Sequence, residues 1–359
     1  NDALSLVERE IGRTLSASER TDAEKICTML EGHPLRILQT VALVREDNVP
    51  LLVVQQQLES ACNSQGWAEH LLAKLKKPQT LILMVLAAFG GVALAAEQIA
   101  FLTEQPDINS ILETLIRRNL VQVDGSRYSL SSTLVKHLQQ KFNLTTFLER
   151  AANYFMNWIQ QNQEVPERLL EESDVILQIM EWAYEVKRWE NVLCLGRGIE
   201  GVLALNGQWG VWDLVLQWVL TAVCNTGDKA AEAFALHQLG TRSLCLDEIT
   251  KAHEYLTQAL HIRQELLNDQ VGVEATNHNL KFILEPPPVQ PPDPQPEPGL
   301  LFKGGITLLL LVLGGLLSQL LAINFNGGTT TPTPTPTLSP TPTPTPTPKR
   351  KLQIHNQYL

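Results

Sequence analysis

Residues 251–267, KAHEYLTQALHIRQELL, decide the fold that we expect of this chain. The side chains that follow the three- and four-residue spacing of one helix face are Ala252, Tyr255, Leu256, Ala259, Leu260, Arg263 and Leu266. On either side of this helix, residues 235–239, ALHQL, are echoed about forty residues later by residues 276–280, TNHNL. A helix pair that recurs at this period buries its second face only by stacking on other pairs, so residues 226–284 predict a repeat of helical hairpins.

Residues 145–225 are predicted to be helical throughout and to continue the same stack. Two segments, 186–189 and 205–209, are typical of turns between paired helices. Six tryptophans occur in this region: Trp158, Trp182, Trp189, Trp209, Trp212 and Trp218. Tryptophan at such spacing more often forms the core of an α-solenoid than a ligand site, so we interpret these side chains as core.

Residues 78–144 have a different pattern. The expected elements are a core helix over 80–89 that Gly90-Gly91 breaks, helices over 93–102 and 108–118, a hairpin over 120–130, and a helix over 134–142. The hairpin is indicated by Asp124-Gly125 between two β-prone runs, because both central residues of a type I′ turn need positive φ. Three helices, a hairpin and a helix predict a winged-helix arrangement.

A winged helix can read DNA through basic and polar residues on its third helix. In the helix over 108–118 the bases are Arg117 and Arg118 at the C-terminal end, with Glu113 one turn earlier. Acids and bases are about balanced over this segment, so we expect it to pack against protein. A winged-helix transcription regulator remains the weaker alternative.

Residues 1–77 are predicted to form a helical domain. Ser16 and Ser18 are candidate caps before a Glu-rich helical turn. Further on, Gly32-His33-Pro34-Leu35 precedes a helix over 36–45: Gly32 lets the chain turn, and Pro34 suits the first helical turn, where its missing N–H costs nothing. A break between two packed helices is the simplest explanation of this motif.

The C-terminal part divides into three segments. Residues 285–299, EPPPVQPPDPQPEPG, predict a polyproline-II spacer, and residues 326–359 contain a Thr-Pro repeat that we expect to be disordered. Between them, residues 300–325 contain the uncharged stretch 304–323, which at about 1.5 Å rise per residue spans roughly 30 Å, the thickness of the hydrocarbon core of a bilayer. The sequence therefore predicts a single-pass transmembrane helix.

The orientation of this predicted anchor follows from the body of the chain. Five cysteines without a CxxC pair suit free thiols in a reducing compartment, so we expect a cytoplasmic body and a Thr-Pro tail outside. Gly314 and Ser318 form a small-xxx-small pair that weakly predicts helix dimerisation, and hence a homo-oligomer.

Composition and motifs limit the function classes. The formal net charge is −10, which gives the chain no bulk attraction for phosphate backbones, so no nucleic-acid partner is expected. We find no nucleophile–base pair, no paired carboxylates at catalytic spacing and no metal-ligand spacing, so we predict neither a catalytic nor a metal site.

Taken together, residues 1–284 resemble the C-terminal two-thirds of a bacterial, cyanobacterial-type signal-transduction NTPase of the STAND class, of the NB-ARC type. Gly32-His33-Pro34-Leu35 resembles the GxP motif of that family, residues 120–130 resemble its winged-helix hairpin, and residues 235–280 are similar to its tetratricopeptide sensor repeats. The resemblance implies that Gly32 and Pro34 form a cofactor-binding motif, with Pro34 against the adenine of ATP or ADP. It also implies a protein partner bound through the repeats.

Two departures from that family pattern concern the nucleotide. The sequence contains no GxxxxGK[ST] loop and no acidic Walker-B strand, so ATP or ADP is an expected cofactor only if an upstream domain supplies that chemistry. The chain begins at Asn1 without Met, and we interpret it as a fragment or a processed product. Where the family places a phosphate-contacting His, this chain has Ser131, and His137 lies about two turns later.

The predicted function is the regulatory and sensing portion of a membrane-anchored STAND ATPase, which binds a partner through its repeats. The alternative is a non-catalytic membrane-anchored scaffold for protein–protein interaction. Whether the complete parent protein is an enzyme stays open.

Overall fold

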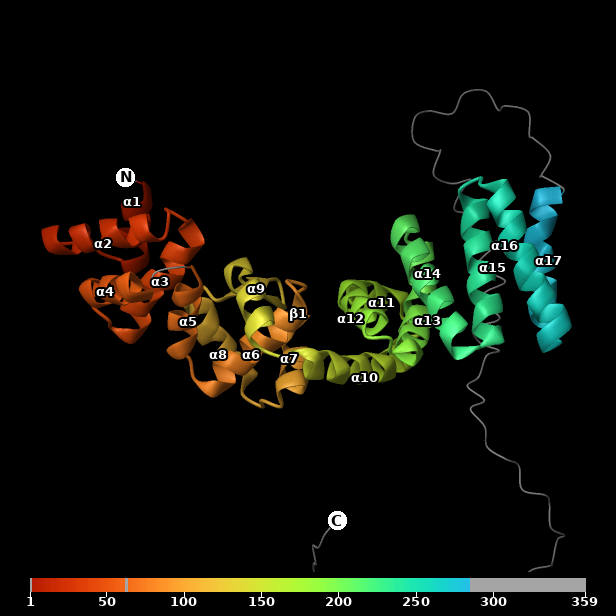
Figure 1. The fold of residues 1–359 in the computed structure, drawn as a ribbon, viewed down its shortest axis with the longest axis horizontal. Helices are drawn as coiled ribbons and strands as arrows, with labels where there is room; N and C mark the ends of the chain where they lie inside the picture. The colour runs from red at the N-terminus through yellow and green to blue at the C-terminus, as the bar shows by residue number, and fades with distance from the viewer. Residues whose placement is uncertain (1, 62–63, 285–359) are drawn as a thin grey trace, which may run out of the picture. The chain divides into compact units, whose positions relative to one another are not determined.

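The computed structural model describes residues 2–61 and 64–284, which are mainly helical (Figure 1). All the described residues lie in one compact unit. The mainly helical fold class is therefore confirmed.

The N-terminal part contains the helices α1 (Asp2–Ile11), α2 (Ala17–Met29), α3 (Pro34–Asp47), α4 (Leu51–Ala61) and α5 (Ser64–Ala73). Ser16 caps α2 in a capping box: its hydroxyl accepts from the Glu19 backbone N–H at 3.3 Å, and the Glu19 carboxylate accepts from the Ser16 N–H at 2.9 Å. The other predicted cap, Ser18, lies inside α2, so that prediction is wrong. Only Ser16 is placed three residues before a glutamate that can return the bond.

The next part contains α6 (Lys77–Ala88), β1 (Leu94–Ala95), α7 (Ala96–Thr103), α8 (Ile108–Arg117), β2 (Val121–Asp124), β3 (Arg127–Leu130) and α9 (Ser132–Lys141). The three strands form an antiparallel sheet in the order β1-β3-β2. The predicted helix over 93–102 begins later, at Ala96, because Leu94 and Ala95 pair with β3 instead. Two residues of pairing leave too weak a pattern for the sequence to reveal a strand.

The hairpin is confirmed, but its turn is one residue later than predicted. Asp124 pairs with Arg127, so the two central residues are Gly125 and Ser126. Of these two only Gly125 has a positive φ, at +56°. A type I′ turn requires positive φ at both positions, so that prediction is wrong; positive φ at the first position alone is the requirement of a type II′ turn.

The helical stack contains α10 (Thr145–Asn162), α11 (Pro166–Glu171), α12 (Ser173–Glu185), α13 (Trp189–Leu205), α14 (Trp209–Thr226), α15 (Lys229–Cys245), α16 (Ile249–His261), the π-helical turn η1 (Ile262–Leu267) and α17 (Gln270–Leu284). From α12 onward each α-helix packs on the next one in sequence. The helix predicted to run continuously over 251–267 is α-helical only as far as His261 and becomes π-helical from Ile262. The spacing of the apolar residues does not indicate this change.

Apolar side chains join α14, α15 and α16. Val219 and Val223 of α14 pack against Ala231 and Ala235 of α15. A second buried apolar cluster joins Ala233 and Leu236 of α15 to Ala259 of α16 and Ile262 of η1. Of the six tryptophans predicted as core, Trp212 is fully buried and Trp182 nearly so, while the other four are half-buried.

The predicted spacer, transmembrane helix and tail, residues 285–359, lie outside the described residues. Within the described ranges, none of the helices combines the length and the apolar character needed to cross a membrane.

Candidate functional site

The two residues predicted to bind a cofactor lie at the start of α3: Gly32 in the turn before it and Pro34 within it. Gly32 has φ +67°, which lets the chain turn sharply after α2, and Pro34 is the first residue of α3. His33 is the N-cap, and its ring Nδ1 accepts from the Arg36 backbone N–H at 3.5 Å. His33 and Pro34 are both exposed. The motif therefore presents an open helix N-terminus whose surface is available for contact.

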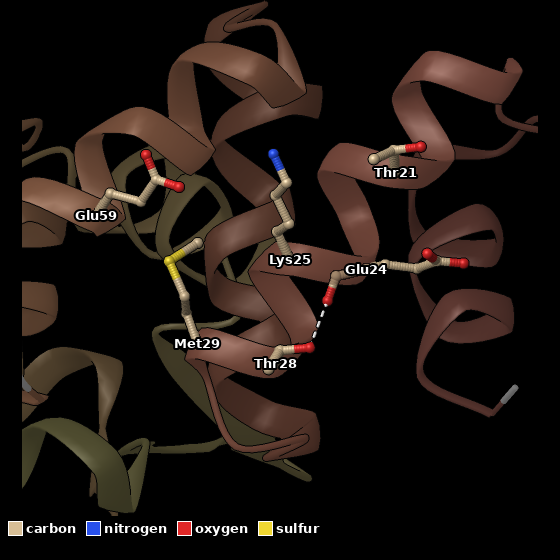
Figure 2. A pocket seen from close by; sticks show the side chains of 6 residues that line it. All are labelled: Thr21, Glu24, Lys25, Thr28, Met29 and Glu59. Atoms are coloured by element: carbon tan, nitrogen blue, oxygen red, sulfur yellow. Dashed lines mark hydrogen bonds between the residues drawn. The ribbon is translucent and has the colours of Figure 1, made fainter.

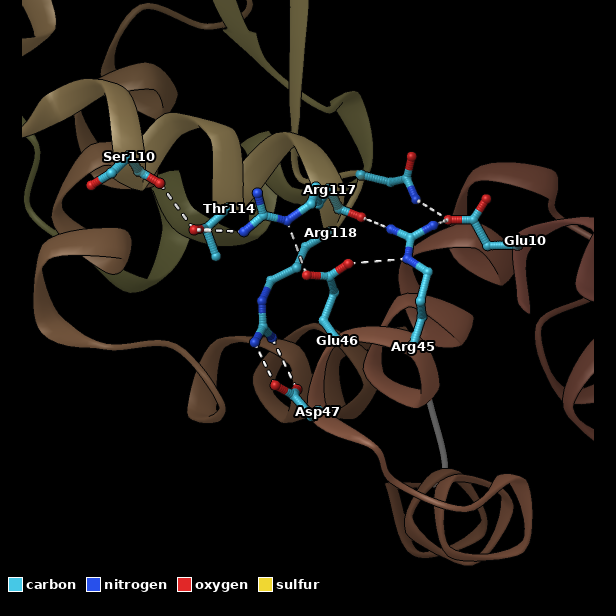
Figure 3. A network of polar contacts seen from close by, with 9 residues as sticks. Glu10, Arg45, Glu46, Asp47, Ser110, Thr114, Arg117 and Arg118 are labelled. Carbon is cyan, nitrogen blue, oxygen red and sulfur yellow. Dashed lines mark hydrogen bonds and ion pairs between the residues drawn. The ribbon is translucent and has the colours of Figure 1, made fainter. Parts of the chain in front are cut away.

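The C-terminal end of α3 is bound to the end of α8 by a network of charged groups (Figure 3). Arg118 donates twice to the Asp47 carboxylate, once at 3.0 Å. Arg117 donates from Nε to the Glu46 carboxylate at 3.1 Å. The Arg118 side chain is only 11% exposed, so its two-pronged pairing with Asp47 is partly shielded from water.

Arg45 ties this network to the backbone of residue 117 and to α1. Its guanidinium donates to the Arg117 carbonyl and to the carboxylates of Glu10 and Glu46. The Glu10 carboxylate also accepts from the Asn119 side-chain amide at 3.0 Å. Three helices, α1, α3 and α8, are thereby connected through one guanidinium.

Gln39, near the middle of α3, contacts Asn119, the second residue after α8, and Thr133 of α9. Its side-chain amide donates to the Asn119 carbonyl at 2.8 Å, and its oxygen accepts from the Thr133 hydroxyl at 3.0 Å. The Ser131 hydroxyl donates to the same Asn119 carbonyl at 2.9 Å. We call the contacts that Gln39, Arg45, Glu46 and Asp47 make with residues 117–119 the α3 clasp.

The electrostatics of the α3 clasp favour its charged form. Burial pushes the pKa of Glu46 up, but the hydrogen bonds from Arg45 and Arg117 outweigh burial and hold that pKa below its usual value. The carboxylate is therefore ionised at neutral pH, as its two guanidinium partners require.

Ser131 and His137 differ in their surroundings. Ser131 is fully buried, and its hydroxyl is used in the bond to Asn119, so it supports the clasp. Burial first, and then the nearby charge of Lys141, lower the pKa of His137. Its Nε2 has no hydrogen-bond partner among the described residues.

The clasp also bears on the DNA-reading alternative. Arg117 and Arg118 are the bases at the end of the third helix, and both guanidinium groups are paired with acids of α3. A phosphate or base edge would compete with Glu46 for the half-exposed Arg117 and with Asp47 for the shielded Arg118. This geometry favours protein packing over groove recognition.

A shallow pocket of about 310 Å³ lies between α2 and α4 (Figure 2). Its lining residues are Thr21, Glu24, Lys25, Thr28, Met29 and Glu59. A single lysine with two glutamates offers no nucleophile and base in hydrogen-bond contact. Within the described ranges, no three His, Cys, Asp or Glu side chains are grouped so that they could hold a metal ion.

A buried carboxyl group that the sequence patterns did not reveal lies in the helical stack. Glu200 of α13 accepts from the indole N–H of Trp212 at 2.9 Å and from the Gln238 amide at 3.2 Å. Burial raises the pKa of Glu200 to about 7, although the two hydrogen bonds, taken alone, would lower it. The signal in the sequence for this buried carboxyl is the position of a glutamate among the apolar residues of α13.

Comparisons with known proteins give one distant likeness. No protein-family model matches the sequence, and no curated protein matches it. A similar solved structure is the crystal structure of a signal transduction ATPase with numerous domains (STAND) with a tetratricopeptide repeat sensor from Pyrococcus horikoshii, at 15% identity and a TM-score of 0.42. The match covers 88% of this chain and 47% of that chain, so this chain spans less than half of that protein. That protein belongs to the class that the motifs resemble, but the likeness is too distant to transfer an activity.

Proposed function

We propose that this chain is the regulatory and sensing portion of a membrane-anchored STAND-class ATPase, with the nucleotide chemistry supplied by an upstream domain. The observation that carries the proposal is the placement of α3. One end of this helix exposes the Gly32-His33-Pro34 motif, and the other end is fixed by the α3 clasp to residues 117–119. A conformational change at the exposed end of α3 is thereby transmitted through the α3 clasp to residues 77–141.

The part that receives this change has the element order of a winged helix: helix, strand, two helices, hairpin and helix. It is also bound to the helical stack. Arg127 of β3 donates to the Glu172 carboxylate, at the start of α12, at 2.7 and 3.2 Å. We propose that residues 77–141 act as a winged helix that transmits the state of the nucleotide domain to the stack.

The helical hairpins from α13 to α17 would be the sensor. Helical-hairpin stacks bind protein partners on their extended surfaces, so the expected partner is a protein. Residues 304–323 would fix this sensor to the membrane, with the body on the cytoplasmic side.

The experiment that tests the nucleotide part uses the chain together with any sequence that precedes Asn1 in its gene. Calorimetry should show ATP or ADP binding, and Pro34→Ala should raise the dissociation constant several-fold because Pro34 would contact the adenine. Lys25→Ala, on the neighbouring α2 and outside the motif, is the control and should leave that constant unchanged. Absence of nucleotide binding by the extended protein would leave the alternative function, a membrane-anchored scaffold that captures a protein partner.

The α3 clasp predicts measurable coupling between α3 and α8. In a double-mutant cycle with Asp47→Ala and Arg118→Ala, the coupling free energy should be about 1–2 kcal/mol, because the pair is two-pronged and partly shielded from water. The measurement is chemical denaturation of the full chain. The exposed pair Arg13–Glu19 is the control and should show weaker coupling. Equal coupling in the two cycles would mean that the clasp is a surface ion pair without structural effect.

A further inference from the structure

The last of the described helices, α17, is attached to α15 and η1 by buried polar groups. Asn279 donates from its side-chain amide to the Thr241 hydroxyl of α15 at 2.8 Å. The Thr276 hydroxyl lies 3.2 Å from Nδ1 of His237, also on α15. These four side chains are all buried. They form the base of what we call the α17 seat.

Arg263, in the π-helical turn η1, completes the α17 seat. Its guanidinium is 5% exposed and donates to the Gly272 carbonyl at 2.6 Å and to the Thr276 hydroxyl at 2.7 Å. A Cβ at residue 272 would lie 2.0 Å from an oxygen of the Asp269 carboxylate and 2.8 Å from Arg263 Cδ, so both side chains would have to shift to admit it. Asp269 in turn accepts from the Gly272 N–H at 2.9 Å.

The attachment of α17 is polar and apolar together. Among the described side chains, α17 buries Val273 and Leu280 beside the polar groups of the seat, and the helix also packs on α16. Exposing apolar surface costs roughly 25 cal/mol per Å², whereas a hydrogen bond that is exposed is replaced by one to water, and its net worth is about 1 kcal/mol. The polar part of the attachment is therefore readily exchanged for hydrogen bonds to water when α17 separates.

We propose that α17 is a detachable helix, which leaves the α17 seat on α15 and η1 as a unit while the rest of the stack stays folded. In sequence, α17 comes directly before residues 285–299, so any displacement of the C-terminal segment reaches α17 first. Detachment exposes His237, Thr241 and Arg263 together, a polar surface that recognises a helix with Gly, Thr and Asn at the spacing of residues 272, 276 and 279. The inference is independent of any nucleotide chemistry.

Hydrogen exchange of the full chain tests the proposal. Amides of α17 should exchange at least about tenfold faster than those of α15, with little dependence on denaturant, as expected of local opening. Gly272→Ala should speed exchange in α17 by a further factor of about ten and leave α15 unchanged, because the added methyl group displaces the Arg263 and Asp269 side chains that hold α17. Gly201→Ala on α13 is the matched control, since its Cβ meets nothing within 4 Å, and it should change neither helix.

A peptide of residues 268–284 tests whether the α17 seat remains formed after detachment. Labelled with a fluorophore, it should bind the Gly272→Ala chain at least tenfold more tightly than the unaltered chain, whose own α17 competes for the seat. The same peptide with Gly272→Ala should bind about tenfold more weakly. Exchange of α17 and α15 at one common rate would overturn detachment, and failure of the peptide to bind either chain would overturn a preformed seat.

Discussion

Glu200→Gln should make the helical stack more stable at pH 8 and change little at pH 5. The Glu200 carboxyl is fully buried, and burial raises its pKa from the ordinary 4.5 to about 7. The folded chain therefore holds this proton more tightly than the unfolded chain does. The resulting stability is fully present below pH 4.5 and is lost as the pH rises through 7.

The size of this effect follows from the pKa difference. Since one pKa unit corresponds to about 1.4 kcal/mol, the difference in free energy of unfolding between Glu200→Gln and the unaltered chain should change by about 2–3 kcal/mol between pH 5 and pH 8. The amide can keep the bond from Trp212. The NH2 group of the substituted side chain can donate to the Gln238 oxygen, which has no partner among the described residues, once the Gln238 amide flips.

The measurement is denaturant unfolding of the full chain, followed by tryptophan fluorescence at several pH values. Other titrating groups are common to both proteins, so they cancel in the difference. Glu190→Gln, an exposed position on the same helix, controls for the loss of a charge as such. A pH-independent difference for Glu200→Gln would show that this carboxyl does not titrate between the two states.

Gly240→Leu should destabilise the stack by about 3 kcal/mol or more. A Cβ at position 240 of α15 would lie 2.6 Å from Leu256 Cγ and 3.2 Å from the Leu256 backbone nitrogen of α16. A side chain can change its rotamer, but the backbone atom can retreat only if α16 moves away from α15. Overpacking of this kind costs typically about 1–3 kcal/mol per site, and a leucine places further carbon atoms beyond its Cβ in the same contact.

Gly201→Leu on α13 is the matched control for the same change in residue type. Its added Cβ would meet no atom within 4 Å, and leucine favours the helix over glycine by about 1 kcal/mol. The control should therefore be neutral or slightly stabilising in the same denaturation experiment. Equal losses at positions 201 and 240 would mean that general helix disruption, and not the α15–α16 contact, sets the cost.

The sequence predicted best those features that depend only on residues close to them in the chain. Pro34 as the first residue of α3 and Ser16 as a cap follow from backbone chemistry within a few residues. The strand β1 could not be predicted, because Leu94 and Ala95 become a strand only through pairing with β3, more than thirty residues away in sequence. The type of the hairpin turn failed for a related reason: the register of the two strands, and not the Asp-Gly pair, selects the central residues.

The candidate sites divide in the same way. Gly32 and Pro34 were predicted as a motif, and the structure places them together at the exposed end of α3; their contact with a nucleotide stays a prediction. The α3 clasp could not be predicted, because Asp47 and Arg118 are separated by 71 residues and meet only in the folded chain. Nor does residue spacing show that Glu200 lies beside Gln238.

Two hydrogen bonds of the α3 clasp do not depend on which side chains stand at residues 117 and 119. Gln39 and Arg45 donate to the main-chain carbonyls of residues 119 and 117, groups that every amino acid provides. Evolutionary drift at 117 and 119 would leave these acceptors in place, provided that residue 119 tolerates its φ of +56°, as Asn and Gly do. The constraint therefore differs between the two kinds of contact: the bonds from Gln39 and Arg45 depend only on the α3 side chains, whereas the bond to Asp47 also depends on the guanidinium at residue 118.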